Sequence, residues 1–380
     1  MTRIALLMLV GDPPKYLGLI FGVMFAALLM TQQMAIFVNL MRRTASVIYD
    51  VQEAQIWVMD PRVRYLEEVE PLADTAVQRV RGVEGVAWAA PLMKGSGVIR
   101  TPGGVLQQVV LLGIDDATLT GGPRQMLAGS LESLGMEDAV IMDRAGYAYI
   151  WPGEPLEIGR RVEINDREAV LVGICEASPP FNTFPILYTR YSLARAFSPP
   201  TRNQLSFVLA RAEEGECVDG LAERIGQRTG LAAVTSGQFA WQTIEHYLTR
   251  TGIPINFGIT VLLGFLVGAA IVGQTLYLFV VENIRQLAAL KAMGVTGSRL
   301  AGMVLLQGAV VGGIGYGLGF GAAALFFELT GRTSEAFRGF FLPWEVGVIA
   351  GVAIGLIILL ATLASMRRVL RVDPALVFRG

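Results

Sequence analysis

The sequence has few charged side chains, and lysine and histidine are almost missing from it. Of its 380 residues only 17% are charged, whereas 53% are hydrophobic. Soluble domains are typically about a quarter charged, so this balance predicts a membrane protein. The formal net charge of −1 argues against a nucleic-acid-binding protein, because such proteins usually carry a basic face.

The scarcity of lysine excludes a nucleotide-binding P-loop. That motif requires glycine, lysine and then serine or threonine in succession, but Lys15, Lys94 and Lys291 follow proline, methionine and leucine. Any ATP-driven role therefore requires an ATPase on a separate subunit. We expect no cofactor in this chain, because ATP and Mg²⁺ would be bound by that partner.

The single histidine, His246, excludes a zinc motif built from two histidines. A serine hydrolase that uses His246 is an alternative, but a structural surface histidine is favoured because no nucleophile motif accompanies it. Glu67, Glu68 and Glu70 lie in a segment with helical periodicity, and we interpret them as a solvated helix face. The sequence predicts no catalytic residue and no metal site, so we do not expect an enzyme.

The two cysteines, Cys175 and Cys217, exclude a disulfide-rich scaffold. Both lie in the middle region, which we expect outside the cytoplasm, where a disulfide between them could form. Two independent thiols are the favoured alternative, because the sequence alone carries no information on the distance between them.

Four stretches are apolar over about the 20 residues that a helix needs to cross the hydrocarbon core. They run from about residue 17 to 40, 253 to 281, 300 to 327 and 343 to 366. The first is too long for the core of a signal peptide, and no small-residue cleavage site follows it. Gln32, Gln33 and Asn39 make its outer half more polar, so we expect that half to face other helices.

The distribution of lysine and arginine near the helix ends predicts the orientation. With both termini in the cytoplasm, the short outer loop holds only Arg332 and Arg338. Arg42 and Arg43, at the outer end of the first span, count against this orientation but are outweighed. We therefore expect residues 44–251 to lie outside the cytoplasm. The cytoplasmic segments would hold Arg3, Lys15, Arg285, Lys291, Arg299, Arg367, Arg368, Arg371 and Arg379.

The last three spans are rich in glycine. Small residues four apart let helix backbones approach closely, since association in lipid depends on packing. Two interpretations remain open: tight packing within one subunit, or a functional surface that is either a seam between two copies or a sliding surface. The residues concerned are Gly264, Gly268, Gly308, Gly312, Gly347, Gly351 and Gly355.

The middle region opens and closes with similar strand–helix–strand patterns. Residues 55–59, 65–81 and 83–99 form the first, and residues 204–209, 215–229 and 231–234 the second. Two βαβ units of this kind combine into one ferredoxin-like sheet. Several short strands separated by glycine and proline, over residues 105–200, predict a β-rich insertion between them. Residues 41–52 and 239–250 could form helical stalks.

The expected organisation is thus an α-helical membrane protein with four spans and an extracytoplasmic α/β domain between the first and second. The predicted boundaries are an N-terminal lead (1–16), first span and stalk (17–52), extracytoplasmic domain (53–238), stalk and second span (239–281), cytoplasmic loop (282–299), third span (300–327), outer loop (328–342), fourth span (343–366) and cytoplasmic tail (367–380).

The loop after the second span predicts a short amphipathic helix. Ile284, Leu287 and Leu290 recur at helical spacing, and Gly294 is a good C-terminal stop. We expect Leu287 and Leu290 to be exposed on the cytoplasmic side. An ordinary connector between two spans is the alternative.

The same loop resembles that of FtsX/MacB-type ABC transporter permeases. It reads Glu-Asn-Ile-Arg-Gln-Leu-Ala-Ala-Leu-Lys-Ala-Met-Gly over residues 282–294, and the Asp-Pro-Ala of residues 373–375 is similar to that family's ending. The Leu-Lys-Ala-Met-Gly run and residues 253–260 look closest to the DevC branch. The resemblance implies that the loop docks on the ATPase, through Glu282, Asn283, Ile284, Arg285, Leu287, Ala288, Leu290, Lys291, Ala292, Met293 and Gly294.

The resemblance also implies partners. They are a cytoplasmic ABC ATPase, a second copy of the chain in a homodimer, a periplasmic adaptor of the membrane-fusion type and a TolC-like outer-membrane protein. On this basis we favour the permease of an ABC exporter that transmits ATP-driven motion to its outer domain. The alternative is an FtsX-like mechanotransmitter, which regulates a cell-wall hydrolase and transports nothing.

Overall fold

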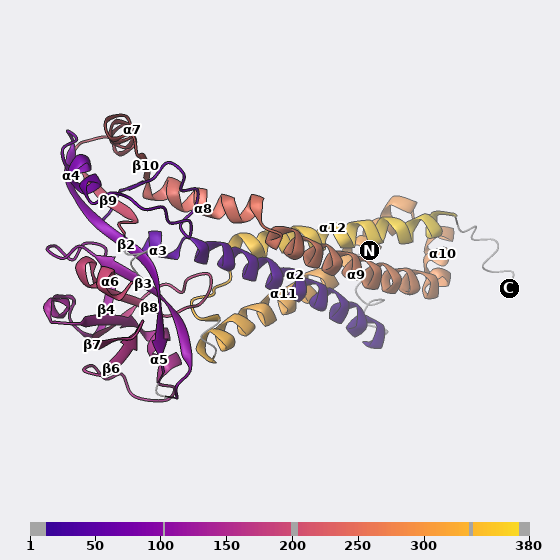
Figure 1. Ribbon diagram of the computed structural model, residues 1–380. Coiled ribbons are helices and arrows are strands. Elements are labelled where there is room, and N and C mark those ends of the chain that lie inside the picture. Colours follow the sequence, from indigo (N-terminus) through magenta and orange to yellow (C-terminus); the bar gives the residue numbers. More distant parts are fainter. Residues whose placement is uncertain (1–12, 102, 199–203, 334–336, 372–380) are drawn as a thin grey trace. The chain divides into compact units, whose positions relative to one another are not determined.

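The computed structural model describes residues 13–101, 103–198, 204–333 and 337–371 (Figure 1). The chain forms two compact units. One combines the segment up to Asn39 with the segment from Gly252 onward, and the other is Leu40–Thr251. Most of the expected N-terminal lead and residues 372–380 of the expected tail lie outside the described residues.

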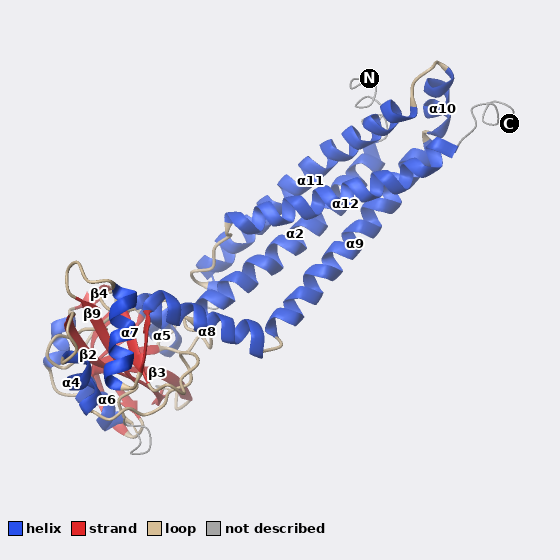
Figure 2. Cartoon of the chain, turned by 90° about the horizontal axis from the view of Figure 1, so that it is seen from above, coloured by secondary structure: helices blue, strands red, loops and turns tan. Residues whose placement is uncertain are grey.

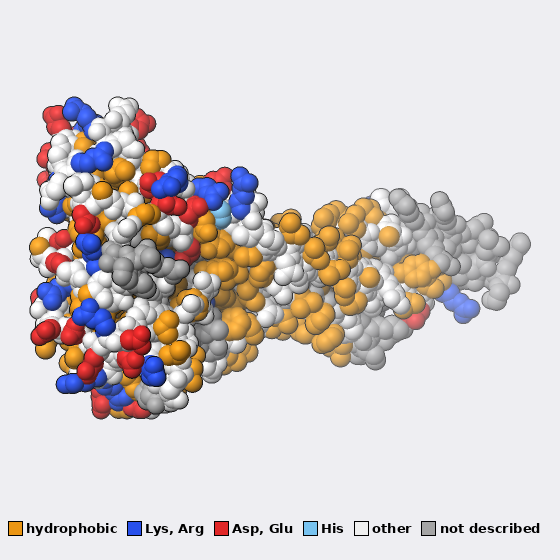
Figure 3. Space-filling view, viewed as in Figure 1, with side chains coloured by type: hydrophobic (Ala, Val, Ile, Leu, Met, Phe, Trp, Pro, Cys, Tyr) orange, Lys and Arg blue, Asp and Glu red, His pale blue; other side chains and the backbone are white. Residues whose placement is uncertain are grey.

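The first unit consists of long helices and is called here the membrane unit. Among the described residues, four of its helices are long and apolar enough to cross a membrane, as judged by length and composition, in agreement with the predicted number of spans. Hydrophobic side chains cover much of the face of these helices seen in Figure 3. The helices are α2 (Pro13–Thr44), α9 (Ile253–Glu282), α11 (Gly297–Thr333) and α12 (Trp344–Arg371).

All four helices contribute to one apolar core. Leu19 and Val23 of α2 pack with Leu276 of α9, Val311 of α11 and Ile357 of α12. Figure 2 shows the four helices running alongside one another. The core therefore joins α2 to three helices that follow it by more than 200 residues in the sequence.

Polar contacts close the outer end of the membrane unit. Asn39 is buried, as expected for the polar half of the first span, and its side chain donates to the carbonyl of Phe341 at 2.7 Å. The same side chain accepts from the backbone N–H of Phe341 at 3.3 Å. Helix α11 continues to Thr333, beyond the predicted end of the third span, and an ion pair between Glu328 and Arg332 one turn apart stabilises that extension.

The second unit is called here the outer unit, and one half of its sheet has the predicted ferredoxin-like arrangement. Two βαβ units interleave, so the strand order is β10-β1-β9-β2 with every neighbouring pair antiparallel. The elements are β1 (Ile56–Met59), α4 (Thr75–Arg81), β2 (Val86–Arg100), β9 (Phe207–Ala212), α7 (Val218–Thr229) and β10 (Ala232–Thr235).

The β-rich insertion continues the same sheet through the long strand β2. Residues 86–92 of β2 pair with β9, and residues 93–100 pair with the first insertion strand. The insertion mixes parallel and antiparallel pairs. Its elements are β3 (Leu106–Ile114), β4 (Gln125–Gly129), η1 (Leu131–Gly135), β5 (Ala139–Asp143), α5 (Arg144–Ile150), β6 (Arg161–Ile164), β7 (Arg167–Glu176), β8 (Ile186–Arg190) and α6 (Tyr191–Phe197).

The helix expected over residues 65–81 begins only at Thr75, so the first part of that prediction is wrong. Pro71 lacks a backbone N–H and disfavours helix in the residue before it. Tertiary contacts hold the preceding segment in an irregular path instead. The N–H of Leu66 donates to Thr243 Oγ1 at 3.2 Å, and that of Leu72 donates to the carbonyl of Leu205 at 2.8 Å.

The expected stalks are separate helices rather than extensions of the spans. Helix α2 ends at Thr44, and the short helix α3 (Ser46–Asp50) follows after Ala45. Helix α8 (Ser236–Arg250) begins with a capping box between Thr235 and Gln238 and ends before α9 starts. Each stalk is thus helical, with a break between it and the span.

Candidate functional site

The loop between α9 and α11 forms the predicted short helix, α10 (Ile284–Ala292). It ends in a Schellman motif, since the N–H of Val295 donates to the carbonyl of Leu290 at 3.1 Å and that of Gly294 to Lys291 at 3.0 Å. Gly294 has a φ of +90°, a backbone conformation that favours glycine. The glycine therefore ends the helix as the sequence predicted.

The apolar face of α10 packs against its own chain. Leu287 is only 3% exposed and lies in a cluster with Val280 of α9 and Leu300 of α11. Leu290 is partly buried against the same cluster. The expectation that Leu287 and Leu290 are exposed is therefore wrong. The apolar stripe of α10 covers the adjacent ends of α9 and α11, where it would otherwise leave apolar surface in water.

A different face of α10 is exposed. Arg285, Gln286 and Ala292 are exposed, and Met293 has 73% of its surface accessible. A long apolar side chain in so exposed a position beside a cationic and an amide group is suited to contact a partner protein. The candidate docking face, named here the Met293 face, consists of Arg285, Gln286, Ala292 and Met293.

Most of the glycines identified in the sequence contact helices of the same chain. A Cβ added at Gly268 would lie 2.5 Å from the Cβ of Ala26, and one at Gly312 would lie within contact distance of Ile358. Gly264, Gly308, Gly347 and Gly351 also lie against other helices of the membrane unit, whereas an added Cβ at Gly355 meets nothing within 4 Å among the described residues. The structure thus assigns six of the seven to packing within one subunit.

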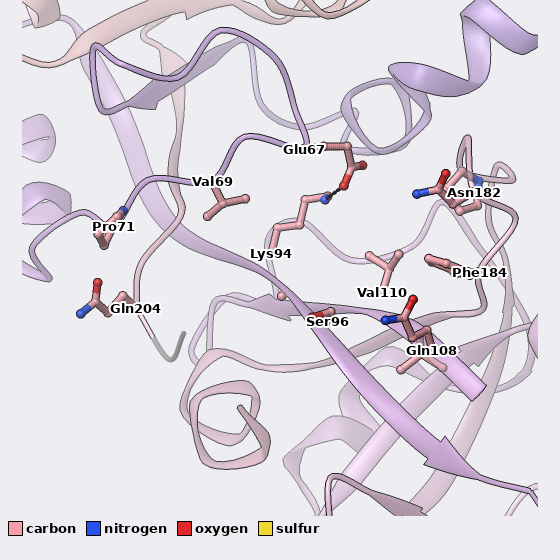
Figure 4. Close-up of a pocket in the computed structure, with 13 residues that line it drawn as sticks. Glu67, Val69, Pro71, Lys94, Ser96, Gln108, Val110, Asn182, Phe184 and Gln204 are labelled. Carbon is pink, nitrogen blue, oxygen red and sulfur yellow. Dashed lines mark hydrogen bonds and ion pairs between the residues drawn. The ribbon is translucent and has the colours of Figure 1, made fainter. Parts of the chain in front are cut away.

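The outer unit contains a cavity of about 470 Å³ (Figure 4). It lies beside the point where β2 changes partner from β9 to β3. Its wall is formed by the segment before α4, strands β2 and β3, the loop after β7 and Gln204, three residues before β9. The lining residues used below are Glu67, Val69, Lys94, Ser96, Gln108, Val110, Asn182, Phe184 and Gln204.

An ion pair lies in this cavity. Lys94 Nζ donates to Glu67 Oε2 at 2.6 Å; the lysine side chain is 7% exposed and the glutamate 37%. The interpretation of Glu67, Glu68 and Glu70 as one helix face is therefore wrong, because their segment is irregular and each carboxylate pairs with a different cation. Glu68 pairs with Arg64 at 2.7 Å. Glu70 pairs with Arg62 at 2.9 Å.

Sequence reasoning missed this cavity, although one signal was present. Lys94 is the only lysine between residues 16 and 290, whereas the chain contains 31 lysines and arginines in total. A lysine in a region that otherwise uses arginine indicates a position where a compact point charge is needed.

Two family models match the chain. The FtsX-like permease C-terminal model matches residues 258–374, which include α10 and the last three spans. The MacB-like periplasmic core domain model matches residues 16–228, more than half of the 380 residues. The chain belongs to the FtsX/MacB-type ABC transporter permeases.

Individual relatives agree with this assignment. Uncharacterized ABC transporter permeases of Mycobacterium tuberculosis and Mycobacterium bovis are 41% identical to this permease over 123 residues, which cover 30% of this chain. The match spans 32% of the length of those relatives.

Solved outer domains are also similar to parts of this permease. The periplasmic region of MacB from Actinobacillus actinomycetemcomitans is 15% identical, covering 52% of this chain and 94% of that one, with a TM-score of 0.39. The extracellular domain of YknZ from Gram-positive bacteria is 14% identical, covering 48% and 98%, with a TM-score of 0.36.

The family also agrees with the predicted fold class. An N-terminal span is followed by a periplasmic-type α/β domain and then by three further apolar helices.

The remaining sequence candidates have structural roles. His246 stacks on Tyr65 with ring centroids 3.9 Å apart. Cys175 is buried in β7, whereas Cys217 is exposed at the start of α7, and both are free thiols, so the disulfide is absent from the structure. Burial, followed by the nearby Asp143 carboxylate, raises the pKa of the Cys175 thiol. No group of metal-binding side chains occurs among the residues described.

Proposed function

We propose that this permease transmits ATP-driven motion from a separate cytoplasmic ATPase to its outer unit, as part of an export system. The observation that supports this is the construction of α10. Its apolar side is buried in the membrane unit through Leu287 and Ala288, while the Met293 face is exposed. A helix fixed on one side and open on the other is suited to receive force from a docked protein.

The path of that force follows the packing. Because Leu287 lies in one cluster with Val280 and Leu300, a displacement of α10 displaces the ends of α9 and α11. Helix α11 in turn lies against α2 through Gly315 and Gly319, where added Cβ atoms would come within 3 Å of α2. The outer unit is joined covalently to the spans at both of its ends. Helix α2 continues into it at one end, and the connection from α8 to α9 leaves it at the other.

The test is the substitution Met293→Glu, alone and with Arg285→Glu. Burying a methionine side chain at an interface contributes about 1.5–3 kcal/mol, and a charge in its place removes that contribution. We expect normal membrane insertion and loss of the ATPase that co-purifies from the native host, measured as ATP hydrolysis in the purified complex. Gly294 is left unchanged, since its φ ends the helix.

The matched control is Ser298→Glu, which adds a carboxylate in the same loop at the first turn of α11, where an acidic side chain is tolerated. It should retain the ATPase. Leu287→Glu is unsuitable, because it would place a charge in the buried cluster and disrupt α10 itself. If the Met293 and Arg285 variants both keep the ATPase at wild-type levels, α10 is only a connector.

The orientation proposed from the charges places residues 282–299 in the cytoplasm and residues 44–251 outside, in a bacterial inner membrane. A membrane-impermeant maleimide should therefore label a cysteine at Glu213 and spare one at Ser298. The exposed Cys217 must first be replaced by serine, since it would react itself. Labelling of Ser298→Cys without Glu213→Cys would reverse the orientation.

The proposed assembly is a homodimer with an ATPase under each copy, a periplasmic adaptor of the membrane-fusion type and a TolC-like duct, as in the DevC branch. Purification of the intact complex from its host tests this. An adaptor among the partners supports export. A cell-wall hydrolase in its place would favour the alternative of an FtsX-like mechanotransmitter that carries no substrate.

A further inference from the structure

We propose that the cavity beside β2 binds a ligand that carries a carboxylate next to an apolar group, with the Lys94 ammonium as its counter-ion. The cavity lies entirely within the outer unit, and its volume of about 470 Å³ is in the range of small-molecule sites. The inference does not depend on the proposed function, because it concerns binding by the permease alone.

The first argument is the chemistry of Lys94. An ammonium group has three N–H donors. Among the described residues its hydrogen-bond acceptor is a single oxygen, Glu67 Oε2. Because the lysine side chain is almost fully buried, its other donors lie within the cavity rather than in bulk water. They are placed to bind a further oxygen.

The second argument is that Glu67 is a counter-ion that can be displaced. It lies on the irregular segment between β1 and α4, and 37% of its side chain is exposed. An ion pair with an exposed partner is weak, because water screens it and the free side chain gains conformational entropy. A ligand carboxylate that replaces Glu67 keeps Lys94 neutralised, so no unpaired charge is left buried.

The third argument is the remainder of the wall, which combines amide groups with an apolar surface. Figure 4 shows the side chains of Gln108, Asn182 and Phe184 on the β3 and β7–β8 side of the cavity. Amides can bind a peptide-like or acylated group, and Phe184 with Val110 offers contact to an apolar substituent. Among the described residues that line the cavity, Lys94 is the only cation. Those residues therefore fit a single negative charge, whereas bidentate binding of phosphate usually uses arginine.

A free carboxylic acid and the C-terminus of a peptide share this chemistry. The experiment uses both, on the full-length permease in detergent, by isothermal titration calorimetry. The probes are N-acetyl-leucine and an acetylated tetrapeptide ending in leucine, each compared with its C-terminal amide. We expect the acids to bind and the amides to bind at least about tenfold more weakly, because the amides lack the charge that pairs with Lys94. The tighter acid identifies the source.

Three variants test the assignment of roles. Lys94→Met should abolish acid binding, whereas Arg100→Met, which removes an exposed cation from the same strand, should leave it unchanged. Glu67→Gln should tighten binding by up to about fivefold, since the competing carboxylate is removed. A purely structural ion pair would give the opposite sign, with weaker or unchanged affinity in Glu67→Gln.

The proposal is overturned if acids and amides bind alike, if neither binds at millimolar concentration, or if Lys94→Met retains wild-type affinity. Should Lys94→Met fail to fold, the comparison of acid with amide and the sign of the Glu67→Gln effect decide the question, because Glu67 is partly exposed and its amide is nearly isosteric.

Discussion

Replacing Gly319 with alanine should weaken the contact between α2 and α11. An added Cβ would lie 2.5 Å from the carbonyl oxygen of Met24, 2.8 Å from the Cβ of Ala27 and 3.0 Å from the backbone nitrogen of Leu28. Two of these three atoms belong to the backbone, which cannot rotate away as a side chain can. The two helices must therefore move apart.

The magnitude follows from the geometry. Overpacking of this kind costs about 1–3 kcal/mol, and a separation of about 0.5–1 Å loses a quarter to a half of the dispersion attraction across the contact. Alanine also gains up to about 1 kcal/mol of helix propensity over glycine. The net loss for Gly319→Ala alone is therefore smaller than the cost of overpacking.

A matched control removes the propensity term. Gly321 lies two residues further along α11, and an added Cβ there meets nothing within 4 Å among the described residues. Gly321→Ala carries the same gain in propensity without the clash. We expect Gly319→Ala to be less stable than Gly321→Ala by about 1–3 kcal/mol, and Gly321→Ala to be at least as stable as the wild type.

The assay is unfolding of the purified permease by titration with sodium dodecyl sulfate, followed by far-ultraviolet circular dichroism. If both variants are at least as stable as the wild type, the assignment of Gly319 to the α2 contact is refuted. If both are less stable than the wild type by the same amount, Gly321 also packs closely, and the oligomeric state of both variants would then test a second copy as the partner.

Three further predictions concern single side chains. Native permease should react with one equivalent of maleimide at the exposed Cys217, and Cys175 should react only after unfolding, without a reductant; protein with no reactive thiol until reduction would contradict this. Burial raises the pKa of the Asp50 carboxyl in the folded state, so folding favours its neutral form. The resulting stabilisation is full below the pKa of the unfolded state, about 3.9, and is lost as pH rises through the higher pKa of the folded state. The melting temperature of the wild type minus that of Asp50→Asn should accordingly fall as pH rises, and a difference independent of pH would disprove it. Asn39→Leu should destabilise the membrane unit by about 1–3 kcal/mol, because it removes both hydrogen bonds between Asn39 and the backbone of Phe341; unchanged thermal stability would contradict this.

Features that depend on neighbouring residues in the chain were predictable. Long apolar stretches predict spans, because the thickness of the bilayer sets the length of helix required. The repeated strand–helix–strand pattern at the two ends of the outer unit predicted a ferredoxin-like sheet with an insertion. The end of α10 followed from Gly294 alone, since its φ of +90° is a local property.

Errors arose where a tertiary contact overrides a local pattern. The segment before Thr75 has helical periodicity, but Pro71 interrupts it. The backbone N–H groups of Leu66 and Leu72 donate outside the segment, to a threonine hydroxyl and to a backbone carbonyl. The periodicity of α10 correctly predicted an apolar stripe. It could not show whether that stripe faces a partner protein or its own chain, because both would bury the same surface.

The sequence by itself determined the number of spans, the fold class of the outer unit and the family, since each depends on composition, spacing or motif. The tertiary structure alone decided which glycines contact another helix, which face of α10 is exposed and that Lys94 meets Glu67 in a cavity. These facts depend on residues far apart in the chain. The packing of whole helices and strands sets their positions. The same local sequence could therefore place a glycine or a helix face either against a neighbouring element or in an exposed position.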